Sequence, residues 1–235
     1  MKNKKSYFLS ALLVLAVLSQ PVLAKNKMMK VDQETPVVNL SRLLPPPPDE
    51  DSEQGRAELL EVLRYQKTRT PAQVALAQAD AQRNVFRFQN VFGKNFTGEN
   101  LPLTAALFDR ALEICKATVA GPKDFFNHPR PFMRHPEVTP CLVKEDEGSY
   151  PSGHATFAAM TAVLLANMVP EKSKAIFQRA QQYSKNRVLG GVHYPSDIEA
   201  GKISGTVIAA VLMKDKNFMK DFVAAKAELR KVLGY

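Results

Sequence analysis

Two long segments of this sequence are apolar on nearly every face, and they constrain the fold more than any other feature. Residues 152–168 and 195–213 are rich in Ala, Val, Leu, Ile and Met and carry few charges. A helix that is apolar all round has to be buried among other helices. The pattern therefore predicts a helical bundle with these two helices at its centre.

Further helices are expected over residues 57–65, 70–92, 104–119, 171–189 and 215–233. Thr70 followed by Pro71 is typical of a helix start, because the hydroxyl caps the first turn and proline fits its first position. No alternation of apolar and polar residues lasts longer than a few positions, so no strand is expected. The prediction is one all-α domain over residues 56–235.

The first part of the chain predicts export. Three lysines precede a mostly apolar stretch over residues 8–18, and small residues follow up to Ala24. This order is typical of a cleaved signal peptide over residues 1–24, and the apolar stretch is short for a membrane span. We expect a periplasmic protein with no stable membrane insertion after cleavage; an uncleaved anchor is the alternative. Residues 25–55, with Pro45–Pro48, are expected to form an extended arm.

The charge balance argues against a nucleic-acid partner. The formal net charge is +9, and it falls to +6 if residues 1–24 with their three lysines are removed. The sequence has no Lys- and Arg-rich run with interleaved aromatic residues, and no helix-turn-helix or zinc-finger spacing. We expect a solvated basic surface that mildly attracts anionic substrates.

The chain has two cysteines, Cys115 and Cys141. In a reducing cytosol both would be free, but disulfides form in the compartment to which a secretory signal leads. The sequence therefore predicts one Cys115–Cys141 disulfide.

Ser152, Gly153 and His154 stand at the start of the first apolar helix. Ser152 is placed to cap the helix, and Gly153 lets a ligand approach the backbone closely. The first amides of a helix are unpaired and carry partial positive charge, which favours an anion. The alternative is an ordinary serine cap with no ligand.

Arg187, His193 and Asp197 form a second cluster. Gly190 and Gly191 end one helix and Pro195 begins the next, so His193 lies in the turn between them. Asp197 falls in the first turn of the new helix, where its carboxylate can accept a hydrogen bond from the His193 ring. A histidine oriented in this way can act as a nucleophile. Asp197 can also simply complement the helix dipole.

Lys123 and Arg130 complete a set of three permanent cations with Arg187. A phosphoryl group in transfer spreads negative charge over three oxygens, and a guanidinium can bind two of them in one plane. The set therefore predicts a site for a tetrahedral oxyanion. The sequence offers no carboxylate cluster able to bind two metal ions, so we expect no metal and no other cofactor.

The order of these motifs resembles the three-part signature of the acid phosphatase and vanadium haloperoxidase superfamily. The three parts are Lys123-x6-Arg130-Pro131, Pro151-Ser152-Gly153-His154 and Arg187-x5-His193-x3-Asp197. The secretory signal, Leu43–Pro48 and Gly148–Tyr150 narrow the resemblance to the bacterial class A non-specific acid phosphatases. One position departs, because Asn186 stands where the family usually has serine.

The resemblance implies a helical fold and a role for each residue. His193 would take the phosphoryl group, Asp197 would orient His193, and His154 would protonate the leaving alcohol and then activate water. Lys123, Arg130, Ser152, the Gly153 amide and Arg187 would hold the phosphate oxygens. His128 and His135 fall outside the signature and are interpreted as loop histidines.

The expected function is hydrolysis of small phosphate monoesters with broad specificity, through a phosphohistidine. A nucleoside polyphosphate hydrolase is the nearest alternative, because the motifs do not separate the two. A vanadate-dependent haloperoxidase and an inactive phosphate-binding protein are more distant ones, and a membrane lipid phosphatase would need several spans. Assembly into a homo-oligomer stays open.

Overall fold

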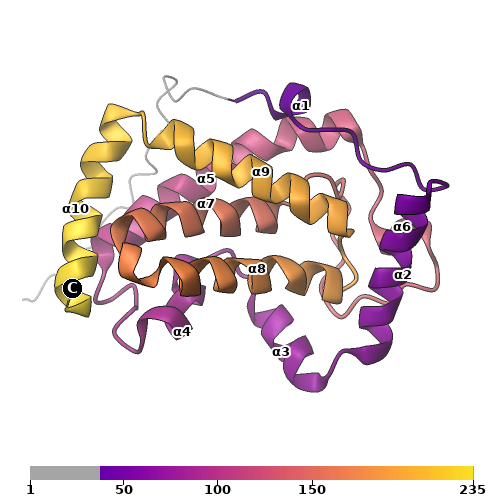
Figure 1. The fold of residues 1–235 in the computed structure, drawn as a ribbon, viewed down its shortest axis with the longest axis horizontal. Helices are drawn as coiled ribbons and strands as arrows, with labels where there is room; N and C mark the ends of the chain where they lie inside the picture. The colour runs from indigo at the N-terminus through magenta and orange to yellow at the C-terminus, as the bar shows by residue number, and fades with distance from the viewer. Residues whose placement is uncertain (1–37, 235) are drawn as a thin grey trace, which may run out of the picture. The chain divides into compact units, whose positions relative to one another are not determined.

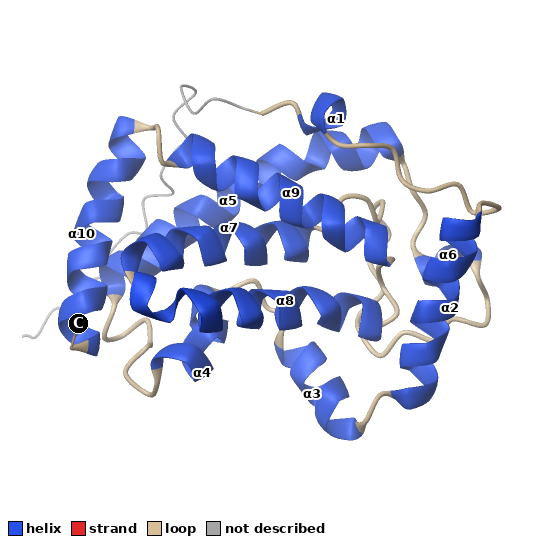
Figure 2. Ribbon diagram, viewed as in Figure 1, coloured by secondary structure: helices blue, strands red, loops and turns tan. Residues whose placement is uncertain are grey.

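A computed structural model of the chain describes residues 38–234, and every regular element in that range is a helix (Figures 1 and 2). The signal peptide predicted over residues 1–24 lies outside the described residues, as do residues 25–37 of the expected arm. The α-helices are α1 (Leu40–Leu43), α2 (Glu53–Thr68), α3 (Pro71–Ala79), α4 (Gln89–Phe92), α5 (Pro102–Phe126), α6 (Pro131–Arg134), α7 (Gly153–Met168), α8 (Ser173–Leu189), α9 (Pro195–Leu212) and α10 (Lys216–Leu233). The predicted all-α fold class is confirmed.

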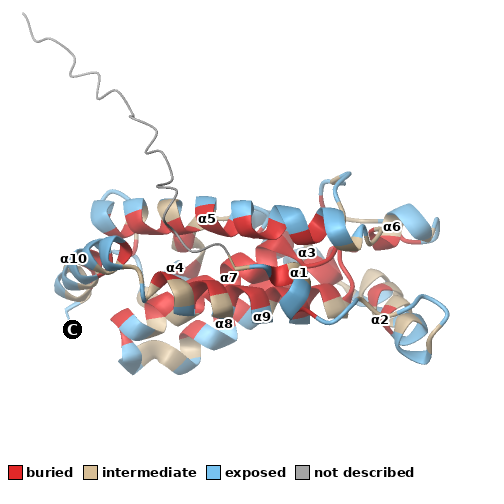
Figure 3. Ribbon diagram, turned by 90° about the horizontal axis from the view of Figure 1, so that it is seen from above, coloured by how far each residue is buried: buried red, intermediate tan, exposed pale blue. Residues whose placement is uncertain are grey.

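Helices α7 and α9 form the centre, as their composition predicts. In Figure 1, α7 runs between α8 and α9, and α5 passes behind it. Two glycines of α9 allow a close approach to α7. A Cβ at Gly201 would lie 2.7 Å from the carbonyl oxygen of Ser152, and one at Gly205 would lie 2.8 Å from the amide of Met160. The two helices therefore pack backbone against backbone, and Figure 3 shows their contact surface as buried.

The long helix α5 and the terminal helix α10 close one end of the bundle. The hydroxyl of Thr104 donates to the carboxylate of Glu228 at 2.8 Å, and Arg110 pairs with Asp221 at 3.0 Å. Asp215 caps α10 by accepting from the Phe218 amide at 2.6 Å. The first two contacts join residues more than a hundred positions apart and hold α10 against α5.

The arm before α2 packs on the domain. Leu40 and Leu44 are buried in the main apolar core. The Tyr150 hydroxyl donates to the Pro45 carbonyl at 2.6 Å. Residues 40–43 form the short helix α1 inside the segment predicted to be extended, and α2 begins at Glu53, before the predicted boundary.

The helix predicted over residues 70–92 is interrupted, so this prediction is wrong. Thr70 caps α3 as expected, in a reciprocal arrangement with Gln73, but α3 ends at Ala79. The buried carboxylate of Asp80 explains the break, because it pairs with Arg87 and with Arg179 of α8. A buried charge is stable only with such partners, and the chain turns out of the helix to reach them.

The predicted end of the helix over residues 104–119 is also wrong. Helix α5 continues through Pro122 to Phe126, and Asn127 ends it in the left-handed conformation with φ 42°. The extra turn carries Lys123 into the interior, where its side chain is only 5% exposed. A prediction based on the usual effect of proline misses this turn.

The predicted Cys115–Cys141 disulfide is wrong, because both thiols are free. Cys115 is fully buried on α5 within the main core. Cys141 packs against a separate small cluster, and its amide donates to the Gly190 carbonyl at 3.1 Å. The two side chains belong to different packing clusters, so they do not meet. Burial raises the pKa of the Cys115 thiol to about 12.

Candidate active site

The turn between α8 and α9 holds His193 between a carboxylate and a guanidinium. Its Nδ1 lies 3.0 Å from Asp197 Oδ2, and its Nε2 lies 3.1 Å from Arg130 Nη1. Arginine can only donate, so Nε2 is the accepting nitrogen and Nδ1 carries the proton. Gly191, with φ +77°, makes the turn that brings the ring there. The predicted His193–Asp197 pair is thus present, and the Nε2 lone pair faces a cation.

Burial lowers the pKa of His193 to about 3, and Arg130 and Arg187 act in the same direction, whereas the hydrogen bond to Asp197 acts against them. The ring is 1% exposed. The neutral form of the ring is therefore favoured, and a neutral imidazole has the lone pair that a nucleophile requires.

Asp197 is fully buried and is held by several donors. Its Oδ2 accepts from the Tyr194 amide at 2.8 Å, and its Oδ1 accepts from the Ser149 hydroxyl at 3.3 Å. Burial alone would raise the pKa of Asp197, but hydrogen bonds from His128 and His193 outweigh it and hold the pKa well below its usual range. The carboxylate therefore stays ionised beside the His193 ring.

His128 lies in the loop between α5 and α6, as expected from the sequence, but its side chain also contacts the group around Asp197. Its Nδ1 lies 3.6 Å from Asp197 Oδ1 and 3.0 Å from the Ser149 hydroxyl. His135 remains at the margin, with Nε2 3.4 Å from Glu50. No motif pointed to His128, because its role depends on a residue almost seventy positions later in the chain.

The three predicted cations converge on two acidic side chains. Arg130 donates to Glu145 at 2.6 Å, and Arg187 lies 3.6 Å from the other oxygen of the same carboxylate. Lys123 and Arg130 lie 3.2 and 3.3 Å from Glu147 Oε1. No sequence motif pointed to either glutamate. Their carboxylates bind these cations as an oxyanion would. A phosphate entering this cluster has to compete with them.

Arg187 is buried, and its Nε has no hydrogen-bond partner in residues 38–234. Burial lowers its pKa to about 10, partly offset by Glu145. A buried donor without a partner is costly. This nitrogen is therefore available to an anion that enters beside Glu145.

Helix α7 begins where predicted, and Ser152 caps it by accepting from the Ala155 amide at 3.4 Å. The Ser152 amide donates to the Asp197 carbonyl at 3.0 Å, which ties this helix start to the His193 turn. The amides of Gly153 and His154, in the first turn, have no intrahelical partner. The two motifs thus meet at one end of the α7–α9 pair.

His154 is almost fully buried, and its Nε2 lies 2.9 Å from the Ala81 carbonyl oxygen. A carbonyl only accepts, so Nε2 carries the proton and Nδ1 has no recorded partner among the described residues. Burial, followed by the charge of Arg187, holds the pKa of His154 well below its usual range. The ring is neutral and has one nitrogen available for proton transfer.

Residues 80–84 were predicted to be part of a helix. They form a loop beside His154, called the 80–84 loop below. The Ala81 carbonyl accepts from His154, and the Gln82 carbonyl accepts from the Tyr183 hydroxyl at 2.7 Å. Asn186 Nδ2 donates to Asp80 Oδ2 at 2.8 Å. The residue that replaces the family's serine therefore connects the 80–84 loop to α8. In the sequence, the one signal of this arrangement was Asp80, an acidic residue among the alternating alanines of positions 75–81.

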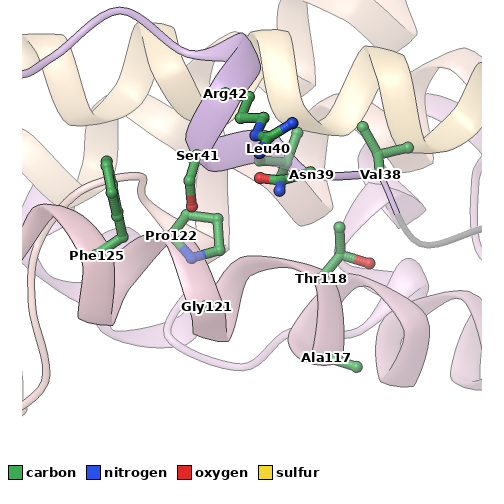
Figure 4. Close-up of a pocket in the computed structure, with 10 residues that line it drawn as sticks. All are labelled: Val38, Asn39, Leu40, Ser41, Arg42, Ala117, Thr118, Gly121, Pro122 and Phe125. Atoms are coloured by element: carbon green, nitrogen blue, oxygen red, sulfur yellow. The ribbon is translucent and has the colours of Figure 1, made fainter.

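A cavity of about 750 Å³ lies elsewhere, between α1 and α5 (Figure 4). Residues 38–42 and one face of α5, including Thr118 and Phe125, line it. None of the predicted site residues does. It therefore has no direct part in the cluster around His193.

Two further properties of residues 38–234 bear on the alternatives raised by the sequence. No helix in this range is long and apolar enough to cross a membrane. No three or more His, Cys, Asp or Glu side chains in it lie close enough together to hold a metal ion.

Known proteins resemble this chain in sequence and in fold. The acid phosphatase of Zymomonas mobilis is 35% identical over 144 residues, which cover 59% of this chain and 54% of that protein. The non-specific acid phosphatase of Salmonella typhi is 28% identical over 202 residues, or 82% of this chain and 80% of that protein. The chain thus spans about half of the first relative and four fifths of the second.

A bacterial vanadium-dependent iodoperoxidase has a similar structure, with a TM-score of 0.55 over 73% of this chain and 52% of that one. At 20% identity this similarity concerns the fold alone. The family model described as the PAP2 superfamily matches residues 102–220, about half of the chain. This range includes the clusters around Lys123, His154 and His193, and the resemblance to acid phosphatases inferred from the sequence is confirmed. The chain belongs to the PAP2 superfamily.

Proposed function

We propose that this chain is an exported phosphatase that hydrolyses phosphate monoesters of varied structure through a phosphohistidine at His193. One observation carries the proposal: His193 Nε2 is an accepting nitrogen 3.1 Å from Arg130, within a cluster that also contains Lys123 and Arg187. A nucleophile among cations suits a substrate whose charge increases on the transferred oxygens. The names of the relatives support this reaction, and the pattern of residues 1–24 supports export.

The reaction proceeds in two steps. His193 Nε2 forms a bond to phosphorus while the ester bond breaks, and the protonated form of His154 gives a proton to the departing alcohol oxygen and becomes neutral. The phosphorylated ring is cationic, and the ionised Asp197 at 3.0 Å stabilises it. His154 then takes a proton from water, whose oxygen attacks phosphorus and releases phosphate from His193. Side chains of this chain carry out each step, so we expect no metal requirement.

The first test is an assay with p-nitrophenyl phosphate at mildly acidic pH, with and without EDTA. We expect activity in both and competitive inhibition by orthovanadate, which adopts the geometry of the transition state and binds more tightly than substrate. Enzyme quenched in alkaline detergent should carry phosphate that is acid-labile and alkali-stable. Loss of activity in EDTA, restored by a divalent metal, or a label on serine would overturn the proposed mechanism.

Substitution of His154 with Ala should separate proton transfer from phosphoryl transfer. We expect a loss of roughly 10²- to 10⁴-fold with alkyl phosphates, and a much smaller loss in the first step with p-nitrophenyl phosphate, whose leaving group needs no proton. Single-turnover measurements on both substrates check this. Equal losses on the two substrates would contradict the role of His154.

The same residue predicts a pH dependence. Burial and Arg187 lower the pKa of His154, so the fraction of rings able to donate a proton increases as the pH falls. In the pH–rate profile, kcat/KM should therefore decrease as the pH rises through the range in which His154 loses its proton. The H154A variant should not show this decrease.

A further inference from the structure

The 80–84 loop lies on the His154 side of the site and is held in place by hydrogen bonds and an ion pair. Its first residue, Asp80, is fully buried and pairs with Arg179 at 3.0 Å. Its next two carbonyls accept from His154 at 2.9 Å and from the Tyr183 hydroxyl at 2.7 Å. The backbone that carries the following residue, Arg83, is therefore held at three consecutive positions.

Arg83 places its guanidinium at the start of α7. Its Nη1 lies 3.1 Å from the position that a Cβ would take at Gly153. The side chain is partly exposed. No hydrogen bond or ion pair joins it to another residue within 38–234, whereas Arg130, Arg179 and Arg187 all pair with acidic side chains.

The charge of Arg83 acts on one side of the candidate site. It contributes to the lowered pKa of His154 and of Arg187. The main charges acting on His193 are instead those of Arg130, Asp197 and Arg187. Arg83 also follows by two positions Ala81, whose carbonyl accepts from His154 at 2.9 Å, and its guanidinium lies at Gly153, next to His154 in the chain. It therefore lies beside the proposed proton donor, which is the side from which the leaving group departs.

We propose that Arg83 forms a second anion subsite, which binds a phosphate carried by the leaving group. This inference rests on the proposed function and narrows its substrate class to compounds in which one phosphoryl group is attached to another, such as inorganic pyrophosphate and nucleoside diphosphates. The guanidinium presents paired donors that suit a phosphate. Lys123, Arg130 and Arg187 remain with the group that is transferred.

The test compares two substrates on one variant. We expect Arg83→Gln to lower kcat/KM for pyrophosphate by roughly 10- to 100-fold, the effect of a lost hydrogen bond to a charged group. The value for p-nitrophenyl phosphate should change by less than about 3-fold, since its leaving group carries no phosphate. The ratio of the two values is the readout, because effects of the variant on folding and on the transferred phosphoryl group are shared by both substrates and cancel in it.

Arg64→Gln is the matched control, since Arg64 lies on α2 with its side chain 59% exposed. It should leave the ratio unchanged. An equal loss on both substrates in R83Q would place Arg83 on the transferred phosphoryl group and overturn the subsite, and so would an unchanged ratio.

A binding measurement separates this inference from the proposed function. Calorimetric titration of the wild type and R83Q with methylenediphosphonate and with inorganic phosphate needs no turnover. R83Q should weaken the diphosphonate selectively by a similar factor. If the wild type hydrolyses no phosphate ester, the proposed function fails, and this titration still decides whether Arg83 binds a second phosphate.

Discussion

Replacement of His193 with Ala is expected to reduce hydrolysis of p-nitrophenyl phosphate by at least roughly 10⁴-fold, as for loss of the nucleophile in other covalent mechanisms. In the proposed mechanism its Nε2 accepts the phosphoryl group, and Arg130 Nη1, 3.1 Å away, stabilises the charge at that point. Steady-state rates and labelling of enzyme quenched in alkaline detergent measure the loss. The variant should carry no labelled phosphate.

His135→Ala serves as the control, because this partly buried histidine pairs with Glu50 at 3.4 Å and lies outside the His193–Asp197 pair. It should retain most of the activity and all of the phosphoenzyme. Thermal unfolding of both variants tests whether the fold is kept. A folded H193A protein that still turns over at more than about one hundredth of the wild-type rate would show that another group takes the phosphoryl group.

Replacement of Asp197 with Asn should have the second largest effect, a decrease in kcat of roughly 10³- to 10⁴-fold, by analogy with loss of the carboxylate in a catalytic triad. Asn keeps the size of the side chain and can still accept from the Tyr194 amide, whose bond to Asp197 is 2.8 Å long. It lacks the negative charge that stabilises the cationic phosphohistidine. Since Asp197 does not bind substrate, KM should change little.

Asp215→Asn provides a matched comparison. Asp215 also accepts from an amide at a helix start, that of Phe218 at 2.6 Å, but it caps α10. Asn is as good a cap as Asp, so this variant should keep wild-type activity. A similar small loss in D197N and D215N would mean that Asp197 acts only as a helix cap.

The fold was predictable where short-range patterns decide it. The segments predicted at 152–168 and 195–213 match α7 and α9 within a residue, because serine or proline begins each helix and apolar composition marks its burial. The helix predicted over 70–92 failed because the break at Asp80 depends on Arg179, about a hundred positions later. Local patterns carry no information about such a pair.

The candidate site was likewise predictable only where local motifs decide it. The motifs predicted that His193 and Asp197 would meet, and they lie 3.0 Å apart. They did not predict Glu145 or His128, whose roles arise only when the loop before α7 folds over the site. The disulfide prediction failed for a related reason, because cysteine counting reports on the compartment and not on distance.

The two glycines of α9 have a consequence for how such a site can change. A side chain at Gly201 or Gly205 would collide with the backbone of α7, at 2.7 Å from Ser152 O in the first case. His154 and Asp197 are therefore carried on a single rigid unit whose spacing cannot be retuned by sliding one helix along the other. Inherited or engineered changes in substrate range have to come from the surrounding loops. Residues 80–84 and 127–150 are the segments to exchange when a different ester is wanted.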